Sequence, residues 1–310
     1  MNLTHLQYFV AAIETGSYSK AARSFEVTQP AISTAIKRLE DEFGSQLVAR
    51  NKEGIELTVA GQSLLENARK LLGDAARLRE DIRQINNVES GVVSIGLRTH
   101  LMTDFAQQTV RSFLRKNPKI HIRIRSGEYQ DLQKKLLEGE LDMIIDHSHL
   151  DRKSTELISE PLFNDPFMVF MSPDHPLANS KTLPVSVVND FPHVYSTLVA
   201  ERAPRAMLQI RKSGYLDHPP EIDIADQNLM GLLVSESKNN YVFIWTYYFF
   251  ERMVRNGQLV AIPLEGVNWE LMISATYRSE ALLSPAARKF IDQLKQELPD
   301  DAAKFGVAAG

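Results

Sequence analysis

The chain has 310 residues, of which 44% are hydrophobic and 24% charged, and its formal net charge is −4. This composition is typical of a globular protein that is long enough for two or three domains. The slightly negative net charge argues against a general polyanion binder. The chain contains no cysteine, which excludes disulfides and thiolate metal sites and suits a reducing cytoplasm.

The sequence gives no indication of membrane insertion or secretion. No stretch reaches the roughly 18 apolar residues of a membrane span. The first ten residues, MNLTHLQYFV, lack the basic front and the apolar core of a signal peptide. We therefore expect a cytoplasmic protein that does not interact with membranes.

Residues 17–44 predict two short helices joined by a polar turn. Ser17 is placed to cap the first of these helices, which is expected to end near Glu26. Thr28 is placed to cap the second helix, and Pro30 fits its first turn, where a missing N–H costs nothing. This pattern is typical of a helix-turn-helix unit.

The second of these helices has an apolar and a polar face. Hydrophobic residues recur at steps of three and four, which predicts one buried stripe formed by Ile32, Ile36, Leu39 and Phe43. The remaining face carries amide, hydroxyl and ammonium groups, which can bond base edges or phosphates in a major groove. The alternative is a solvated face on an ordinary core helix.

The first sixty residues are not basic as a whole, so a DNA footprint must depend on where the cations are placed. Two short extended segments around residues 51–54 precede a long helix and predict a wing. The predicted DNA-binding residues are Ser17, Ser19, Lys20, Thr28, Gln29, Pro30, Ser33, Thr34, Lys37, Arg38, Arg50 and Lys52.

The first 61 residues contain a specific run of residue types at fixed positions. It consists of Leu6, Phe9, Gly16, Ser17, Ala21, Ala22, Gln29, Pro30, Ala31, Ser33, Leu39, Glu40, Gly44, Leu47, Arg50, Leu57, Thr58, Ala60 and Gly61. In this run the amino-terminal sequence closely resembles the LysR-type transcriptional regulators. Val48 departs from the aromatic residue usual in the family, and Thr34 replaces a longer polar side chain.

Residues 59–88 predict a long helix with few breakers and a heptad seam, which suits a partner helix. The alternative is that this helix packs only on its own domain. The resemblance implies that it pairs two subunits, and it further implies a tetramer built as a dimer of dimers. The predicted seam consists of Leu64, Ala68, Leu71, Ala75, Leu78, Ile82 and Ile85.

From residue 89 onward, short apolar strands alternate with helices, which predicts α/β lobes with mixed sheets. The strand at residues 270–277 and the helix opening at Ser284 look like the missing part of the first sheet. The second lobe is therefore expected to be inserted in the first. The resemblance implies a two-lobed effector domain like the type 2 periplasmic binding proteins. The expected divisions are a winged helix-turn-helix domain (1–58), a linker helix (59–88), lobe I (89–161 and 267–300), lobe II (162–266) and a tail (301–310).

A ligand of such a domain is expected in the cleft that faces the carboxyl ends of the strands. Polar and aromatic residues that follow the strands favour a small organic anion, with an aromatic one as an alternative. Each of them has a competing interpretation as a packing or surface residue, and the acidic ones could pair with the cations. The candidates are Arg98, Thr99, His100, Glu128, Tyr129, Asp146, His147, Tyr195, Ser196, Thr197, Arg202, Phe243 and Trp245.

These features predict a DNA-binding regulator controlled by a small molecule, with promoter DNA and the chain itself as partners and RNA polymerase as a further candidate. An enzyme is not expected, because Glu128, Asp146 and His147 lack a third partner or a recognised catalytic motif. We assign no metal and no cofactor. A solute-binding protein would account for the two lobes and not for the winged helix.

Overall fold

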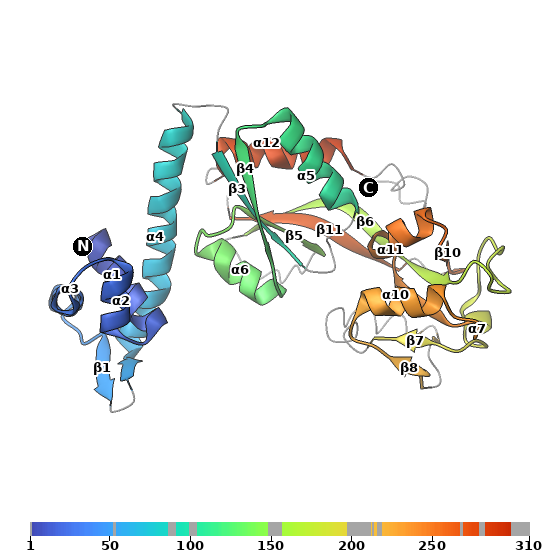
Figure 1. Cartoon of the computed structure of the whole chain (residues 1–310), viewed down its shortest axis with the longest axis horizontal. Helices are drawn as coiled ribbons and strands as arrows, with labels where there is room; N and C mark the ends of the chain where they lie inside the picture. Colours follow the sequence, from blue (N-terminus) through green and yellow to red (C-terminus); the bar gives the residue numbers. More distant parts are fainter. Residues whose placement is uncertain are drawn as a thin grey trace.

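The computed structural model describes residues 2–51, 54–85, 91–98, 104–147, 157–196, 212, 214–215, 219–266, 269–278 and 283–298. Figure 1 shows an amino-terminal domain, a long helix beside it, and two lobes that follow in the chain. None of the helices in the described ranges combines the length and the apolar composition needed to cross a bilayer.

The amino-terminal domain is a winged helix-turn-helix. Its core is formed by apolar residues from all of its helices, including the fully buried Leu6, Phe9 and Leu39. Gly44 ends the third helix with a φ of 62°, a left-handed conformation that favours glycine. The elements are α1 (Leu3–Thr15), α2 (Tyr18–Ser24), α3 (Gln29–Phe43), β1 (Val48–Asn51) and β2 (Gly54–Leu57).

The turn between α2 and α3 differs in detail from the prediction. Helix α2 ends at Ser24, slightly before the predicted Glu26, because Glu26 has a left-handed φ of 55°. Ser17 caps α2 as predicted, since its hydroxyl accepts a hydrogen bond from the Lys20 N–H at 3.4 Å. The capping role predicted for Thr28 is wrong: Thr28 occupies the N-cap position, but its side chain makes no capping bond. Pro30 lies in the first turn of α3 as predicted.

The long helix α4 (Val59–Ile85) begins in the first domain and extends beyond it. Leu65 and Ala68, in its first half, are buried in the core of the first domain. Further along, Leu71, Leu78 and Ile82 are 42%, 61% and 53% exposed. The helix therefore has an amino-terminal half that packs on its own domain and a later half whose apolar stripe faces outward.

Lobe I is a mixed sheet covered by helices. Strand β3 is parallel to β4 and β5, and β11 runs antiparallel to β5. The prediction that a late strand and helix complete the first sheet is confirmed, because β11 and α12 belong to the core of this lobe. Its elements are β3 (Gly91–Leu97), α5 (Asp104–Lys116), β4 (Ile120–Ser126), α6 (Tyr129–Leu137), β5 (Met143–His147), β11 (Glu270–Tyr277) and α12 (Pro285–Gln296).

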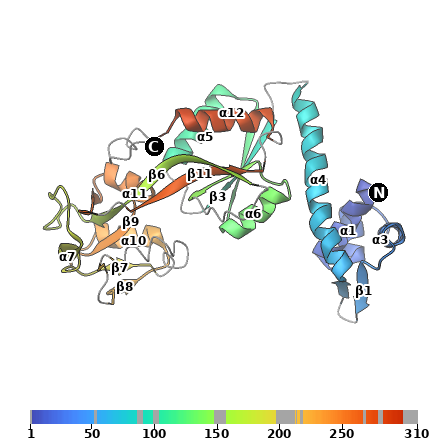
Figure 2. The ribbon, with the colours of Figure 1, turned by 180° about the vertical axis from the view of Figure 1, so that it is seen from behind.

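Strand β6 (Ile158–Met171) belongs to both lobes. Its first part pairs with β11, as far as Pro166 opposite Glu270, and its last part pairs with β9 from Phe167 onward. Lobe II adds α7 (Val185–Val188), β7 (Val194–Tyr195), β8 (Ile222–Asp223), α10 (Gln227–Ser235), β9 (Val242–Thr246), α11 (Tyr247–Arg255) and β10 (Val260–Ile262). The view from behind shows the same continuous strand passing between the lobes (Figure 2).

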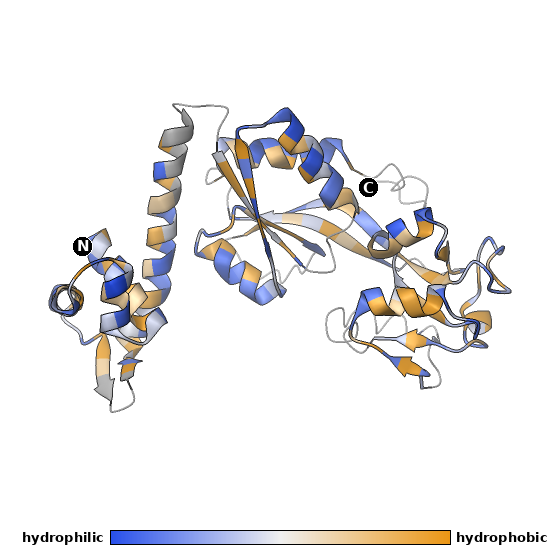
Figure 3. Cartoon of the chain, in the orientation of Figure 1, coloured by the Kyte–Doolittle hydropathy of each residue, from blue (hydrophilic) through white to orange (hydrophobic). Residues whose placement is uncertain are grey.

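The distribution of hydropathy explains these layers. Figure 3 shows hydrophobic residues concentrated on the strands and hydrophilic residues on the outer sides of α5 and α6. Strands β5 and β9 are buried along their whole length, as expected of central strands. In the turn before β9, Asn240 adopts a φ of 57°, a left-handed conformation that asparagine tolerates better than most residues.

Candidate DNA-reading surface and effector site

Helix α3 presents the predicted polar face to the outside. Ile32, Ala35, Ile36 and Leu39 are buried, and they fix the orientation of the helix on the domain. The residues expected to read DNA lie on the other side: Thr28, Gln29, Pro30, Thr34, Lys37 and Arg38 are exposed, and Ser33 is half-buried. One predicted core residue, Phe43, is 45% exposed, because it lies at the end of the helix.

Helix α2 and the wing flank this face. Ser19 and Lys20 at the start of α2 are exposed, close to the Ser17 cap. Strands β1 and β2 form the predicted wing as an antiparallel pair, with Asn51 opposite Gly54. Of the wing cations, the side chain of Arg50 and all of Lys52 lie outside the described residues.

The predicted seam of α4 is divided between two roles. Ala68 was expected in the seam, yet it is fully buried in the core of its own domain. Leu64 packs on the same core, and Ala75 is half-buried. The outward positions are Leu71, Leu78 and Ile82, and the side chain of Ile85 lies outside the described residues.

At the ends of β3 and β5, the structure brings three of the predicted effector residues together. Arg98 follows β3 and is almost completely buried, with its guanidinium 3.6 Å from an Asp146 carboxylate oxygen. A second guanidinium nitrogen of Arg98 lies 3.5 Å from Glu128, whose side chain is 58% exposed. Arg98 is therefore held between one buried and one exposed carboxylate. Tyr129, which follows Glu128 in the chain and is the first residue of α6, is half-buried.

His147 belongs to a second buried polar group. Its Nε2 lies 3.6 Å from a carboxylate oxygen of Asp165, a buried residue of β6. The same Asp165 accepts a hydrogen bond from the backbone N–H of Tyr248 at 3.0 Å. Asp165 was not among the residues predicted from the sequence, although an acidic residue inside an apolar strand is a usable signal of a buried site. Asp165 joins β6, β5 and α11 near the crossing between the lobes.

The surroundings of Asp146 shift the pKa of its carboxyl group. Burial raises the pKa of Asp146 from 3.8 to about 6, although Arg98 and His147 both act to lower it. Desolvation disfavours the ionised carboxylate, and the nearby cations only partly compensate for it.

The effector residues predicted from lobe II lie in different environments. Tyr195 is half-buried, and Ser196 is buried with its hydroxyl in the interior. Phe243 and Trp245 belong to the lobe II core, where Phe243 stacks on Phe170 at a centroid distance of 5.0 Å. Thr99, His100, Thr197 and Arg202 lie outside the described residues.

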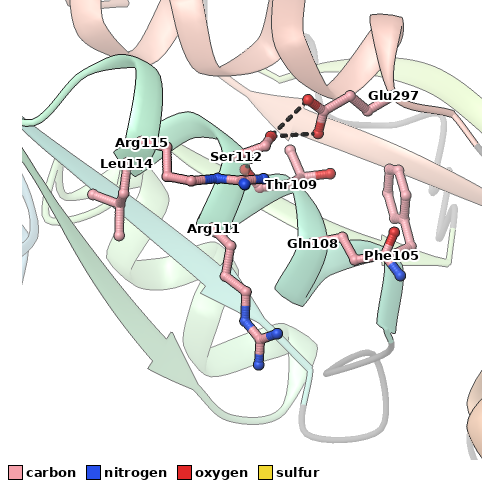
Figure 4. A pocket seen from close by; sticks show the side chains of 8 residues that line it. All are labelled: Phe105, Gln108, Thr109, Arg111, Ser112, Leu114, Arg115 and Glu297. Atoms are coloured by element: carbon pink, nitrogen blue, oxygen red, sulfur yellow. Dashed lines mark hydrogen bonds between the residues drawn. The ribbon is translucent and has the colours of Figure 1, made fainter.

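A separate cavity lies on the outer side of lobe I. It has a volume of about 740 Å³ and is lined by α5 and the residue after α12 (Figure 4). Inside it, the Ser112 hydroxyl donates to the Glu297 carboxylate at 2.6 Å. None of the predicted effector residues lines this cavity. Within the described ranges, no group of acidic and histidine side chains is arranged to hold a metal ion.

Comparison with known proteins identifies both parts of the chain. Residues 3–62 match the model of the bacterial regulatory helix-turn-helix proteins of the lysR family, and residues 86–299 match the LysR substrate binding domain. The chain is similar to the HTH-type transcriptional regulator AlsR of Bacillus subtilis, with 33% identity over 192 residues, which cover 62% of this chain and 63% of that protein. It is also 31% identical over 186 residues to the DNA-binding transcriptional dual regulator OxyR of Escherichia coli, covering 60% of each chain. The match thus spans about three fifths of the length of these relatives.

Solved structures share the fold over nearly the whole chain. Full-length OxyR of Pseudomonas aeruginosa has a TM-score of 0.68 at 22% identity, covering 96% of this chain and 94% of that one. CbnR, solved as a full-length protein in complex with its target DNA, has a TM-score of 0.56 at 19% identity, covering 96% of this chain and 100% of that one. Together, the two matching family models cover both the amino-terminal winged helix-turn-helix domain and the two-lobed domain. The chain therefore belongs to the LysR family of bacterial regulatory helix-turn-helix proteins.

Proposed function

We propose that this protein is a sequence-specific DNA-binding transcriptional regulator and not an enzyme. The observation that carries the proposal is the orientation of α3: its apolar stripe is buried, and Gln29, Thr34 and Lys37 are exposed on the opposite side. Amide, hydroxyl and ammonium groups on one helical face can contact base edges and phosphates in a major groove. CbnR, which has a similar fold, was solved in complex with its target DNA, and this supports DNA binding by the present chain.

We propose that the functional unit of the protein is a dimer. A larger assembly, such as a dimer of dimers, can contain this unit. Leu71, Leu78 and Ile82 form an exposed stripe on α4, and exposed leucines at this spacing favour a partner helix. Pairing two chains holds two reading heads at a fixed separation along the duplex. RNA polymerase is a further partner that a promoter-bound regulator would meet.

The proposed effector is a small organic anion that binds between the two lobes. In this proposal lobe I comprises residues 89–161 and 267–300, and lobe II comprises residues 162–266. Arg98 is the cation that would receive it, and Asp146 and Glu128 already hold Arg98. Asp146 is buried, whereas Glu128 is 58% exposed. An incoming carboxylate would therefore displace Glu128 and leave the Asp146 pair in place.

A gel-shift experiment with genomic fragments tests the function. The expected result is selective retention of a fragment that carries a palindrome-like site, and this retention should persist at moderate salt. Retention that disappears with salt and does not depend on sequence would contradict the proposal. A thermal-shift screen of small carboxylates and aromatic acids tests the effector class, because a ligand stabilises the state to which it binds.

A further inference from the structure

Helix α6 has a charged contact at each of its ends, and the two contacts belong to different functional regions. Before its first turn, the N-cap residue Glu128 lies 3.5 Å from Arg98 at the proposed effector site. After its last turn, Glu138 lies 3.4 Å from Arg69 of the linker helix α4. Figures 1 and 2 both show the end of α6 turned toward α4. The helix itself is nine residues long, or about 14 Å.

Arg69, which contacts Glu138 at the end of α6, also contacts the amino-terminal domain. Arg69 donates to the Glu14 carboxylate at 2.9 Å, and Glu14 is in the last turn of α1. One guanidinium thus joins the first domain, the linker helix and lobe I. Burial raises the pKa of Glu138, although Arg69 opposes the shift. The Arg69 side chain is only 21% exposed, so this contact is partly shielded from solvent.

At this junction the backbone of α4 lies in close contact with the backbone at the end of α6. A Cβ at Gly73 of α4 would lie 1.9 Å from the Glu138 carbonyl oxygen, so only glycine fits there. On the other side, Arg278 donates to Asp74 of α4 at 2.6 Å and to the Leu137 carbonyl at 3.4 Å. A cation at the carboxyl end of α6 also complements the helix dipole. Any shift of α6 along its axis must therefore move against α4.

We propose that α6 transmits the occupancy of Arg98 to the linker helix, with Glu128 as the displaced residue at one end and Arg69 as the positioning residue at the other. This inference rests on the proposed function, since it assumes that an effector acts through Arg98. An anion that replaces Glu128 releases the start of α6. The rigid helix carries that change to Glu138 and Gly73, and the angle between α4 and lobe I changes with it.

The experiment uses Glu128→Gln as a substitute for the unidentified effector, because the amide weakens the contact with Arg98 at an exposed position. The chain has no cysteine, so Ser63→Cys on α4 and Lys289→Cys on α12, both exposed, give unique sites for spin labels. Labelled full-length chain is diluted with unlabelled chain, and the separation of the labels is measured by pulsed electron paramagnetic resonance. DNA affinity is measured on the fragment retained in the gel-shift experiment.

Glu128→Gln is expected to shift the label separation and to change DNA affinity by about two- to thirtyfold. The same substitution in an Arg69→Met background is expected to give clearly smaller changes in both readouts, because the Arg69 contact is lost, while the contacts of Gly73 and Arg278 still join α6 to α4. Glu138→Gln is a second way to break that contact and is expected to give the same result as Arg69→Met. Asp131→Asn, which neutralises an exposed carboxylate in the first turn of α6, is the matched control and should leave both readouts unchanged.

Two results would overturn the inference: no shift on Glu128→Gln in the wild-type background, or an equal shift with and without Arg69. Failure of the proposed function would look different. A shift in label separation without selective retention of any DNA fragment would support transmission through α6 and contradict the regulator.

Discussion

Glu40 of the reading helix holds the first residues of the wing, because its carboxylate accepts the backbone N–H of Leu47 at 2.9 Å and of Val48 at 3.3 Å. These bonds fix the wing relative to α3 and its proposed DNA-reading face. Glu40→Ala should lower the free energy of unfolding of the first domain by about 1 to 3 kcal/mol, since it leaves two amides without their acceptor. Urea unfolding of the full chain measures this, with the exposed Asp41→Ala on the same helix as the control.

Gln29→Ala should reduce discrimination between the selected fragment and random DNA, because the amide can bond adenine in two places. The expected loss is about 1 to 3 kcal/mol of discrimination, with little change in thermal stability, since Gln29 is exposed. Competition gel-shifts measure the ratio of affinities. Gln46→Ala, the same change at an exposed position outside α3, should leave that ratio unchanged. A fall in stability with unchanged selectivity would show that Gln29 has a structural role.

Replacing Leu71 and Leu78 with Asp should dissociate the dimer, because both leucines are exposed in the single chain and charges would be buried between paired helices. Sedimentation velocity measures the change in mass. Ala76→Asp, at an exposed position on another side of α4, should leave the dimer intact. A double variant that stayed dimeric would place the subunit contact elsewhere.

Arg98→Ala should lower stability as well as remove the ligand response, because it leaves Asp146 buried without its guanidinium. The expected cost is about 3 to 5 kcal/mol. Arg98→Ala combined with Asp146→Asn removes both charges and should recover part of it, because no ionised carboxylate is then left buried without its guanidinium. Urea unfolding of the single and double variants separates the two effects, and additive losses would mean that the pair is not coupled.

The pKa of Asp146, which burial raises from 3.8 to about 6, predicts a pH dependence of stability. Between about pH 4 and pH 6, the folded chain binds this proton more tightly than the unfolded chain does. The contribution of Asp146 to stability is therefore greatest below this window and falls as the pH rises through it. Arg98 and His147 face the same carboxyl group.

Asp146→Asn should flatten this part of the pH dependence, and urea unfolding at several pH values measures the difference between the two slopes. Asp131→Asn, at an exposed position, should retain the wild-type slope. Identical slopes in wild type and Asp146→Asn would contradict the raised pKa.

The local elements were predictable because each depends on a short stretch of chain. The apolar spacing of Ile32, Ile36 and Leu39 and the turn before Gly54 are enough to predict α3 and the wing. The sequence placed Arg98 and Asp146 near the ends of two strands, and parallel strands end at one edge of a sheet, so proximity of the two side chains was one of the interpretations that the sequence offered.

The sequence by itself determined the helix-turn-helix, its polar reading face and the alternation of strands and helices, since these follow from the period of the hydrophobic residues. Only the tertiary structure decided that Ala68 is buried in its own domain, that Asp165 pairs with His147, and that Gly73 lies against Glu138. These contacts join residues that are far apart in the chain or lie on separately folded parts. Local periodicity holds no information about them, because they depend on how the packed elements meet.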